Sequence, residues 1–170
     1  MSSSDRNKTR LAPLALGLLV ASSLLAGCQV RPLYGEGGAD LAGIEIKPAT
    51  TRVEQVVRNE LIFKFGGGAG EPASPDYTLA LRVQGSTGNV LAAGTDNDFT
   101  AARTTVSGTY TLTARADGKV IASGVRAATA LLDLPSQNYA RLRAIRDGED
   151  RAARSLAAMI EADIAAKLSR

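Results

Sequence analysis

The stretch that decides the fold is residues 100–120, TAARTTVSGTYTLTARADGKV. Apolar and hydroxyl side chains alternate along it, which predicts a long half-buried strand over residues 100–115. Val106, Tyr110 and Leu112 then share one face. Asp117-Gly118 is the strongest hairpin signal in the chain, because these residue types tolerate the positive φ of a tight turn. We therefore expect a return strand over residues 120–131.

The opposite face of this strand is polar, and the neighbouring strands should extend it. On the return strand we place Ile121, Val125 and Leu131 on one face and Ala122, Gly124, Arg126 and Ala128 on the other. The polar face of the middle strands then presents four arginines and no acidic side chain: Arg82, Arg103, Arg115 and Arg126. Arginine's planar fork suits phosphate groups, so this face is a candidate binding surface. An ordinary solvated sheet face is the alternative.

A first helix is expected between two strands. Residues 43–48 alternate apolar and charged, which predicts a short strand with Ile44 and Ile46 inward. Thr51 and Glu54 form a capping-box pattern that begins a helix reaching residues 63–65. Glycines 66–68 end it, since glycine adopts the left-handed conformation at a helix C-terminus without strain.

Downstream of that helix, residues 77–83 alternate as a half-buried strand, and residues 85–88 are expected to form a turn or bulge. After the hairpin, Ser136 is a candidate N-cap for a long helix over residues 137–168 that Gly148 could kink. The expected apolar stripe of this helix comprises Leu142, Ile145, Ala152, Ala153, Leu156, Met159, Ile160, Ile164 and Leu168.

The expected element order is therefore β-α-β-β-β-α. A four-stranded, largely antiparallel sheet has one apolar face, and two amphipathic helices are enough to cover it. This predicts a two-layer α+β domain over residues 43–170.

The N-terminal residues have the pattern of a targeting signal. Arg6, Lys8 and Arg10 precede an uncharged Leu/Ala-rich run that ends in Leu25-Ala-Gly-Cys28, the order of a lipoprotein signal peptide. We expect residues 1–27 to be removed and Cys28 to receive a diacylglycerol and an N-acyl chain. Residues 28–42, rich in glycine, are then a flexible tether. The alternatives are a retained transmembrane anchor over residues 11–30, plain secretion without acylation, and a buried structural cysteine at position 28.

Composition argues against catalysis. The chain has no histidine and a single cysteine, which removes the usual metal ligands, the Ser-His and Cys-His pairs and the commonest general base. We expect no catalytic residue, no metal and no cofactor beyond the acyl chains. Asp96 and Asp98 lack the rest of a calcium loop. The net charge of +3 owes much to the signal peptide, and aromatic residues are few, so nucleic acid is not an expected partner.

Short motifs resemble a known family. Cys28 is followed by Arg31-Pro-Leu-Tyr-Gly35, the first helix contains Arg58-Asn-Glu-Leu61, and residues 123–124 and 136–140 are similar too. The chain resembles LptE, the lipopolysaccharide-assembly lipoprotein, in its alphaproteobacterial form. That resemblance implies two helices on a four-stranded sheet, seated as a plug inside the outer-membrane β-barrel LptD. The pair inserts lipopolysaccharide into the outer leaflet, and the family is not enzymatic.

The resemblance thus implies a lipid-anchored protein on the periplasmic side of the outer membrane, with LptD and lipopolysaccharide as partners. The four arginines would then contact either lipid A phosphates or the polar lumen wall of the barrel. Two other functions stay open: an accessory lipoprotein of an ABC-type lipid transporter, and a periplasmic lipoprotein with no transport role.

Overall fold

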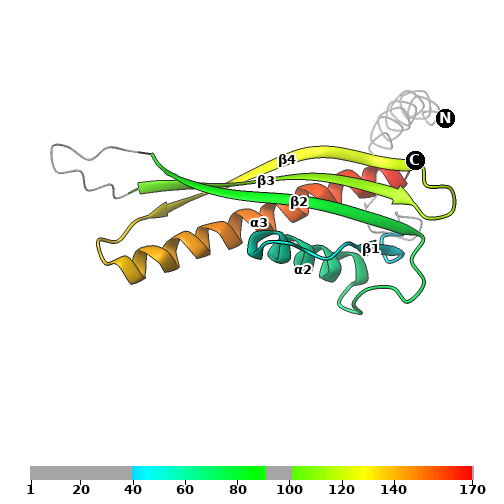
Figure 1. Cartoon of the computed structure of the whole chain (residues 1–170), viewed down its shortest axis with the longest axis horizontal. Coiled ribbons are helices and arrows are strands. Elements are labelled where there is room, and N and C mark those ends of the chain that lie inside the picture. The colour runs from blue at the N-terminus through cyan, green and yellow to red at the C-terminus, as the bar shows by residue number, and fades with distance from the viewer. Residues whose placement is uncertain (1–39, 91–100, 170) are drawn as a thin grey trace, which may run out of the picture. The chain divides into compact units, whose positions relative to one another are not determined.

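We analysed a computed structural model of the chain, which describes residues 40–90 and 101–169. Its elements are β1 (Ile44–Ile46), α2 (Arg52–Gly66), β2 (Tyr77–Asn89), β3 (Ala101–Ala114), β4 (Val120–Asp133) and α3 (Asn138–Leu168) (Figure 1). The expected β-α-β-β-β-α order is confirmed. The expected signal peptide over residues 1–27, Cys28, Asp96 and Asp98 lie outside the described residues.

The four strands form one mixed sheet in the order β1-β2-β3-β4. β1 pairs in parallel with β2, and the other pairs are antiparallel. The predicted hairpin joins β3 to β4, with Gly118 at a φ of 71° and its N–H donating to the Ala114 carbonyl at 3.0 Å. Since only glycine adopts this φ without strain, the Asp-Gly signal identified the turn correctly.

The prediction of a turn or bulge at residues 85–88 is wrong. β2 continues through this segment to Asn89, with Gly85 opposite Val106 and Gly88 opposite Arg103. Glycine has a weak intrinsic preference for strands. Here the backbone hydrogen bonds to the long β3 strand hold the two glycines in the extended conformation. β2 and β3 therefore form a hairpin of two strands of 13 and 14 residues.

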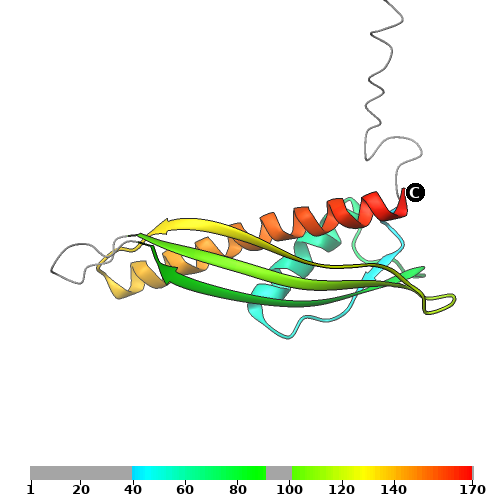
Figure 2. The ribbon, with the colours of Figure 1, turned by 90° about the horizontal axis from the view of Figure 1, so that it is seen from above.

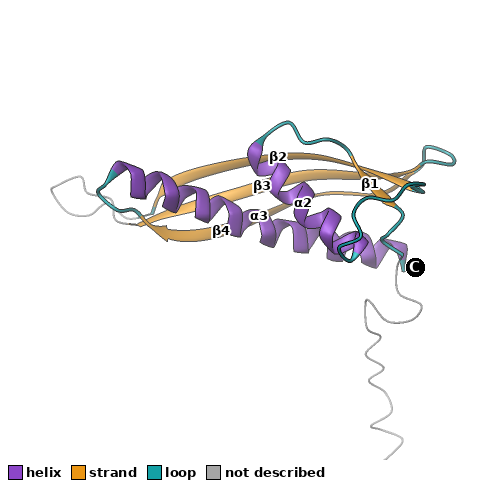
Figure 3. Cartoon of the chain, turned by 90° about the horizontal axis from the view of Figure 1, so that it is seen from below, coloured by secondary structure: helices purple, strands orange, loops and turns teal. Residues whose placement is uncertain are grey.

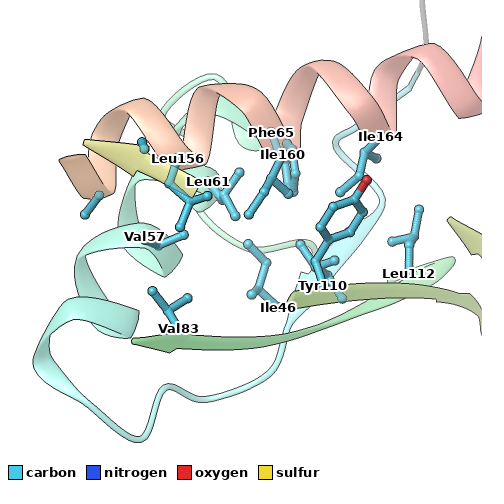
Figure 4. Packing of buried hydrophobic residues seen from close by; sticks show 14 of the residues in the cluster. Ile46, Val57, Leu61, Phe65, Val83, Tyr110, Leu112, Leu156, Ile160 and Ile164 are labelled. Carbon is cyan, nitrogen blue, oxygen red and sulfur yellow. The ribbon is translucent and has the colours of Figure 1, made fainter. Parts of the chain in front are cut away.

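Helices α2 and α3 both cover one face of the sheet and leave the other uncovered (Figures 2 and 3). The core between the layers is mostly aliphatic, with Leu61 of α2, Leu112 of β3 and Ile160 of α3 fully buried (Figure 4). Leu41 is also buried against this core, so the packed part of the chain includes a residue of the expected tether.

Helix α3 is continuous and differs from expectation in two ways. Its N-cap is Gln137 rather than Ser136, and no side chain caps it. Gly148 does not interrupt it. Instead, Gly148 is buried where a Cβ atom would lie 3.1 Å from Leu132 and 3.2 Å from Thr104. The glycine permits close helix–sheet contact.

The apolar stripe of α3 is narrower than predicted. Leu142 and Met159 are exposed, and small side chains take much of the buried face. The buried residues of α3 are Gly148, Ala152, Ala153, Leu156, Ala157, Ile160, Glu161, Ile164 and Ala165. Alanines allow the helix to approach the sheet closely, which places the larger Leu142 and Met159 outside the contact.

The faces assigned to β4 are wrong from Ala122 onward, although Ile121 does pack against the core. Ala122, Ala128 and Leu132 are buried against the helices, whereas Val125 and Leu131 are 63% and 66% exposed. The cause is the register. Ala122 lies opposite buried Leu112 and Ala128 opposite buried Val106, and directly opposed residues share a face. An irregularity between Leu112 and Thr113 makes this register difficult to count from the hairpin.

Candidate functional site

The candidate site is the sheet face that the helices leave uncovered, called here the open face. The register defines it, because directly opposed residues point to the same side. Its members are Thr78, Ala80, Arg82, Gln84 and Ser86 of β2; Arg103, Thr105, Ser107, Thr109, Thr111 and Thr113 of β3; and Ser123, Val125, Ala127, Thr129 and Leu131 of β4. Hydroxyl groups dominate it. Two large apolar side chains stand on β4.

Arg82 and Arg103 lie on the open face as predicted. Both are exposed, and neither forms an ion pair or hydrogen bond with any residue that the structure describes. Arg82 lies in register with Thr109, six residues along β3 from Arg103. Six strand residues span about 20 Å. The two guanidinium groups are therefore too far apart to share one phosphate and suit two separate anionic groups.

Each of these two arginines lines its own shallow hollow. The first, of about 330 Å³, is bordered by Ser86, Gly88, Asn89, Val90, Arg103 and Thr105. The second, of about 160 Å³, is bordered by Arg82, Gln84, Ser107, Gly108, Thr109 and Val125. In both, a cation lies beside hydroxyl groups, which are donors to an anion or a sugar. The face therefore offers hydrogen bonds over a broad area rather than one deep pocket.

Arg115 stands at the hairpin end of the same face but is neutralised. Its Nη1 lies 2.7 Å from Oε2 of Glu45, which β1 places on the open face opposite Thr78. Both side chains are about half exposed, so the pair contributes little to stability, on the order of 0–1 kcal/mol. It does lower the positive charge that Arg115 can offer to a ligand.

Arg126 is not on the open face, which corrects the expected grouping of four arginines. It emerges on the helix side of β4, where its Nη2 donates to Oδ1 of Asp163 in α3 at 2.9 Å. The hydroxyl of Tyr110 donates to the other carboxylate oxygen of Asp163, also at 2.9 Å. Figure 4 shows this hydroxyl pointing toward α3. Burial and the Asp163 carboxylate raise the pKa of Tyr110 to about 12.

The hydroxyl groups and arginines of the open face are suited to hydrogen bonding with a polar or anionic ligand. Among the residues that the structure describes, no cluster of three His, Cys, Asp or Glu side chains could hold a metal ion. Within the same ranges, no helix is long and apolar enough to cross a membrane. The described domain thus offers an uncovered, hydroxyl-rich sheet face with two unpaired arginines.

Comparison with known proteins gives the family. Residues 41–165, well over half of the chain, match the family model LptE, described as lipopolysaccharide-assembly. The chain belongs to the LptE family. A search of curated proteins found no match.

Solved structures share this LptE fold. A lipoprotein of Caulobacter crescentus CB15 is 24% identical, with a TM-score of 0.63 over 76% of this chain and 93% of that one. Rare lipoprotein B from Shewanella oneidensis is 10% identical, with a TM-score of 0.55 over 72% and 92%. A minor lipoprotein from Acinetobacter baumannii is 15% identical, with a TM-score of 0.51 over 72% and 88%. At these identities the likeness establishes the fold alone.

Sequence reasoning missed the apolar part of this LptE-type open face. The sequence prediction placed Val125 and Leu131 on the face opposite Arg126, that is, on the apolar face of the sheet. The available signal was the size of their neighbours. Ala122, Ala128 and Ala130 alternate with them, and a row of alanines is what a closely packed helix requires.

Proposed function

We propose that this protein is an outer-membrane lipoprotein that acts with an LptD-type β-barrel in inserting lipopolysaccharide into the outer leaflet. The family match over residues 41–165 supports a role in lipopolysaccharide assembly. The Leu25-Ala-Gly-Cys28 ending supports removal of residues 1–27 and acylation of Cys28. Residues following Cys28 would then tether the domain to the periplasmic side of the membrane.

The observation that carries the proposal is the difference between the two faces of the sheet, one buried and apolar, the other polar and open. Two helices bury one face, and the other presents hydroxyls over three strands with no covering element among residues 40–90 and 101–169 (Figures 2 and 3). The lumen-facing side chains of an outer-membrane barrel are polar, so they could exchange hydrogen bonds with this open face. We propose that the open face lies against the barrel wall or against lipopolysaccharide within the lumen.

Arg82 and Arg103 are the proposed contacts with negative charge. Each is unpaired among the described residues and stands beside hydroxyls, so each could hold one phosphate of lipid A. Arg115 is a weaker candidate because of Glu45, and Arg126 because of Asp163. The proposed role is binding and assembly without catalysis.

Lipopolysaccharide binding by the purified lipoprotein tests the two arginines. The double variant Arg82→Ser, Arg103→Ser should bind lipopolysaccharide at least several-fold more weakly than the parent, since two charge-assisted contacts are lost. Arg146→Ser is the matched control, an exposed arginine on α3 away from the open face. Equal binding by a folded double variant would remove these residues from the proposal.

Membrane fractionation separates the proposed function from its nearest alternative. An LptD partner should be found with the outer membrane, together with the acylated protein. Recovery in the inner membrane would instead favour an accessory lipoprotein of an ABC-type lipid transporter.

A further inference from the structure

The free edge of β4 is the strongest feature that the proposed function leaves unused. β4 is the last strand of the sheet and spans Val120–Asp133. Arg126 Nη1 donates to the Val125 carbonyl at 3.0 Å, and Arg151 Nη2 donates to the Leu131 carbonyl at 3.1 Å. Both carbonyls therefore point away from β3. Because backbone groups alternate in direction along an antiparallel strand, those of Ala127 and Thr129 point outward as well.

At the opposite edge of the sheet, backbone groups have hydrogen-bond partners. There β1 pairs with β2 at residues 77–79, the Lys47 N–H donates to the Leu79 carbonyl, and the Val83 N–H donates to Glu54. Among the described residues, no group accepts from the outward N–H groups of residues 125, 127, 129 and 131 on β4. This 14-residue edge strand contains no proline and no lysine, residues that protect such edges. Arginine side chains occupy its carbonyls at Val125 and Leu131, but among the described residues no donor reaches those of Ala127 and Thr129.

The β4 edge is flanked by arginines on its helix side and by apolar side chains on the open face. On the helix side lies an open hollow of about 570 Å³, lined by Thr129, Ala130, Leu131, Arg151, Arg154 and Ser155. On the open face, Val125 and Leu131 are both more than half exposed. A strand laid along this edge would alternate its side chains between the arginines and the two apolar residues.

We propose that the β4 edge takes up an extended segment of the barrel partner by strand addition. The segment carries an acidic residue toward Arg154, which has no ion-pair partner among the described residues, and apolar residues toward Val125 and Leu131. Arg151 is already paired with Asp147 at 2.9 Å, so it is a weaker contact. This inference rests on the proposed function, since it assumes that the barrel is the partner. A closed barrel wall has no free edge, so the segment comes from a loop or a terminal region of that protein.

Charge decides against a second copy of this chain as the occupant. Pairing two β4 strands antiparallel about Ala128 would place Leu131 of each copy opposite Val125 of the other. β4 carries no acidic residue before Asp133, so a second β4 strand would offer Arg154 no counter-ion. An acidic segment would supply one.

Removing one outward N–H tests the proposal. Ala127→Pro deletes a donor that the β3–β4 ladder does not use, and edge strands tolerate proline at such positions. Ala127→Val is the matched control, because it keeps the N–H and favours a strand. Tagged parent and variants are recovered from detergent-solubilised membranes, and the barrel protein that accompanies each is quantified by mass spectrometry.

Strand addition predicts that Ala127→Pro retains at most about a tenth of the barrel protein, while Ala127→Val retains the parental amount. Equal retention by a folded Ala127→Pro would overturn the edge inference and leave the proposed function standing. If the parent itself brings down no barrel protein, the proposed function fails and this inference with it. A parent dimer that Ala127→Pro converts to a monomer, measured by light scattering, would identify self-pairing and also overturn it.

A charge variant tests the same edge without touching the backbone. Arg154→Glu should reduce barrel recovery several-fold, whereas Arg146→Glu, the same exchange elsewhere on α3, should leave it unchanged. An equal effect of both exchanges would point to net charge rather than to an acidic segment at this edge, and would contradict the proposal.

Discussion

Glu54 and Val83 join the first helix to the sheet. The Val83 N–H donates to Oε2 of Glu54 at 3.1 Å, and the side chain of Glu54 is buried. The other carboxylate oxygen accepts from the Thr50 N–H at 3.0 Å, and the Thr51 hydroxyl accepts from the Glu54 N–H at 3.2 Å. Thr51 is therefore the N-cap as predicted, but the Glu54 carboxylate accepts from Thr50 rather than from Thr51. The same carboxylate supplies an acceptor for β2 where β1 has ended.

Replacing Glu54 should destabilise the domain. Glu54→Ala leaves the Val83 and Thr50 N–H groups without this acceptor, which should cost about 1–3 kcal/mol of unfolding free energy. Gln55→Ala, at an exposed neighbouring position, is the control. Urea unfolding followed by circular dichroism measures both. A loss no larger for Glu54→Ala than for the control would mean that the bond to β2 contributes nothing.

Gly148→Ala should destabilise the domain even though alanine favours helices. The new Cβ would lie within 3.2 Å of Leu132 and of Thr104, and Thr104 is fully buried. Overpacking of this kind costs about 1–3 kcal/mol. At Gly66, the last residue of α2, a Cβ meets nothing within 4 Å, so Gly66→Ala should be neutral or stabilising. Thermal unfolding compares the two, and a Gly148→Ala variant as stable as Gly66→Ala would refute the close contact.

The raised pKa of Tyr110 predicts a stability change at high pH. The folded pKa is about 12 and the unfolded value is about 10, so neutral Tyr110 stabilises the fold below pH 10. This contribution should decrease as the pH rises above about 10 and be lost through about 12.

Two tyrosine variants isolate that contribution. Unfolding free energies between pH 8 and 11.5 should fall less steeply for Tyr110→Phe than for Tyr139→Phe, because Tyr139 is 74% exposed. Absorbance at the tyrosinate band should show one late-titrating group that Tyr110→Phe removes. Identical pH profiles for both variants would contradict the buried contact with Asp163.

Cys28→Ser should release the protein from membranes. Without the thiol no diacylglycerol can be attached, and the two or three acyl chains of a lipoprotein make anchoring effectively permanent. Fractionation should move the variant to the soluble periplasm or leave it as an uncleaved precursor, and mass spectrometry of the parent should find the acylated N-terminus. A parent whose Cys28 is unmodified would contradict the lipoprotein assignment.

Local signals were sufficient for the topology. The Asp117-Gly118 turn, the Thr51–Glu54 box and the glycines at 66–68 each acted through backbone conformation, which depends on neighbours in sequence. The continuation of β2 through Gly85 and Gly88 was not predictable in this way. It depends on pairing with β3, a contact between segments about 20 residues apart.

The candidate site was only half predictable for a related reason. Arg82 and Arg103 follow directly from strand alternation and lie where expected. Arg126 does not, because one irregularity in the β3–β4 register exchanges the faces of a whole strand. Its partner Asp163 lies 37 residues away in α3, so their ion pair required the packed structure.

The central claim is that the protein works with an outer-membrane barrel. The most direct measurement is recovery of the tagged, acylated protein from membranes solubilised in mild detergent, with mass spectrometry of its companions. If the protein works with an outer-membrane barrel, one large β-barrel protein should be recovered in a stoichiometric amount, together with lipopolysaccharide. Recovery of the protein alone, or with inner-membrane permease subunits, would contradict it.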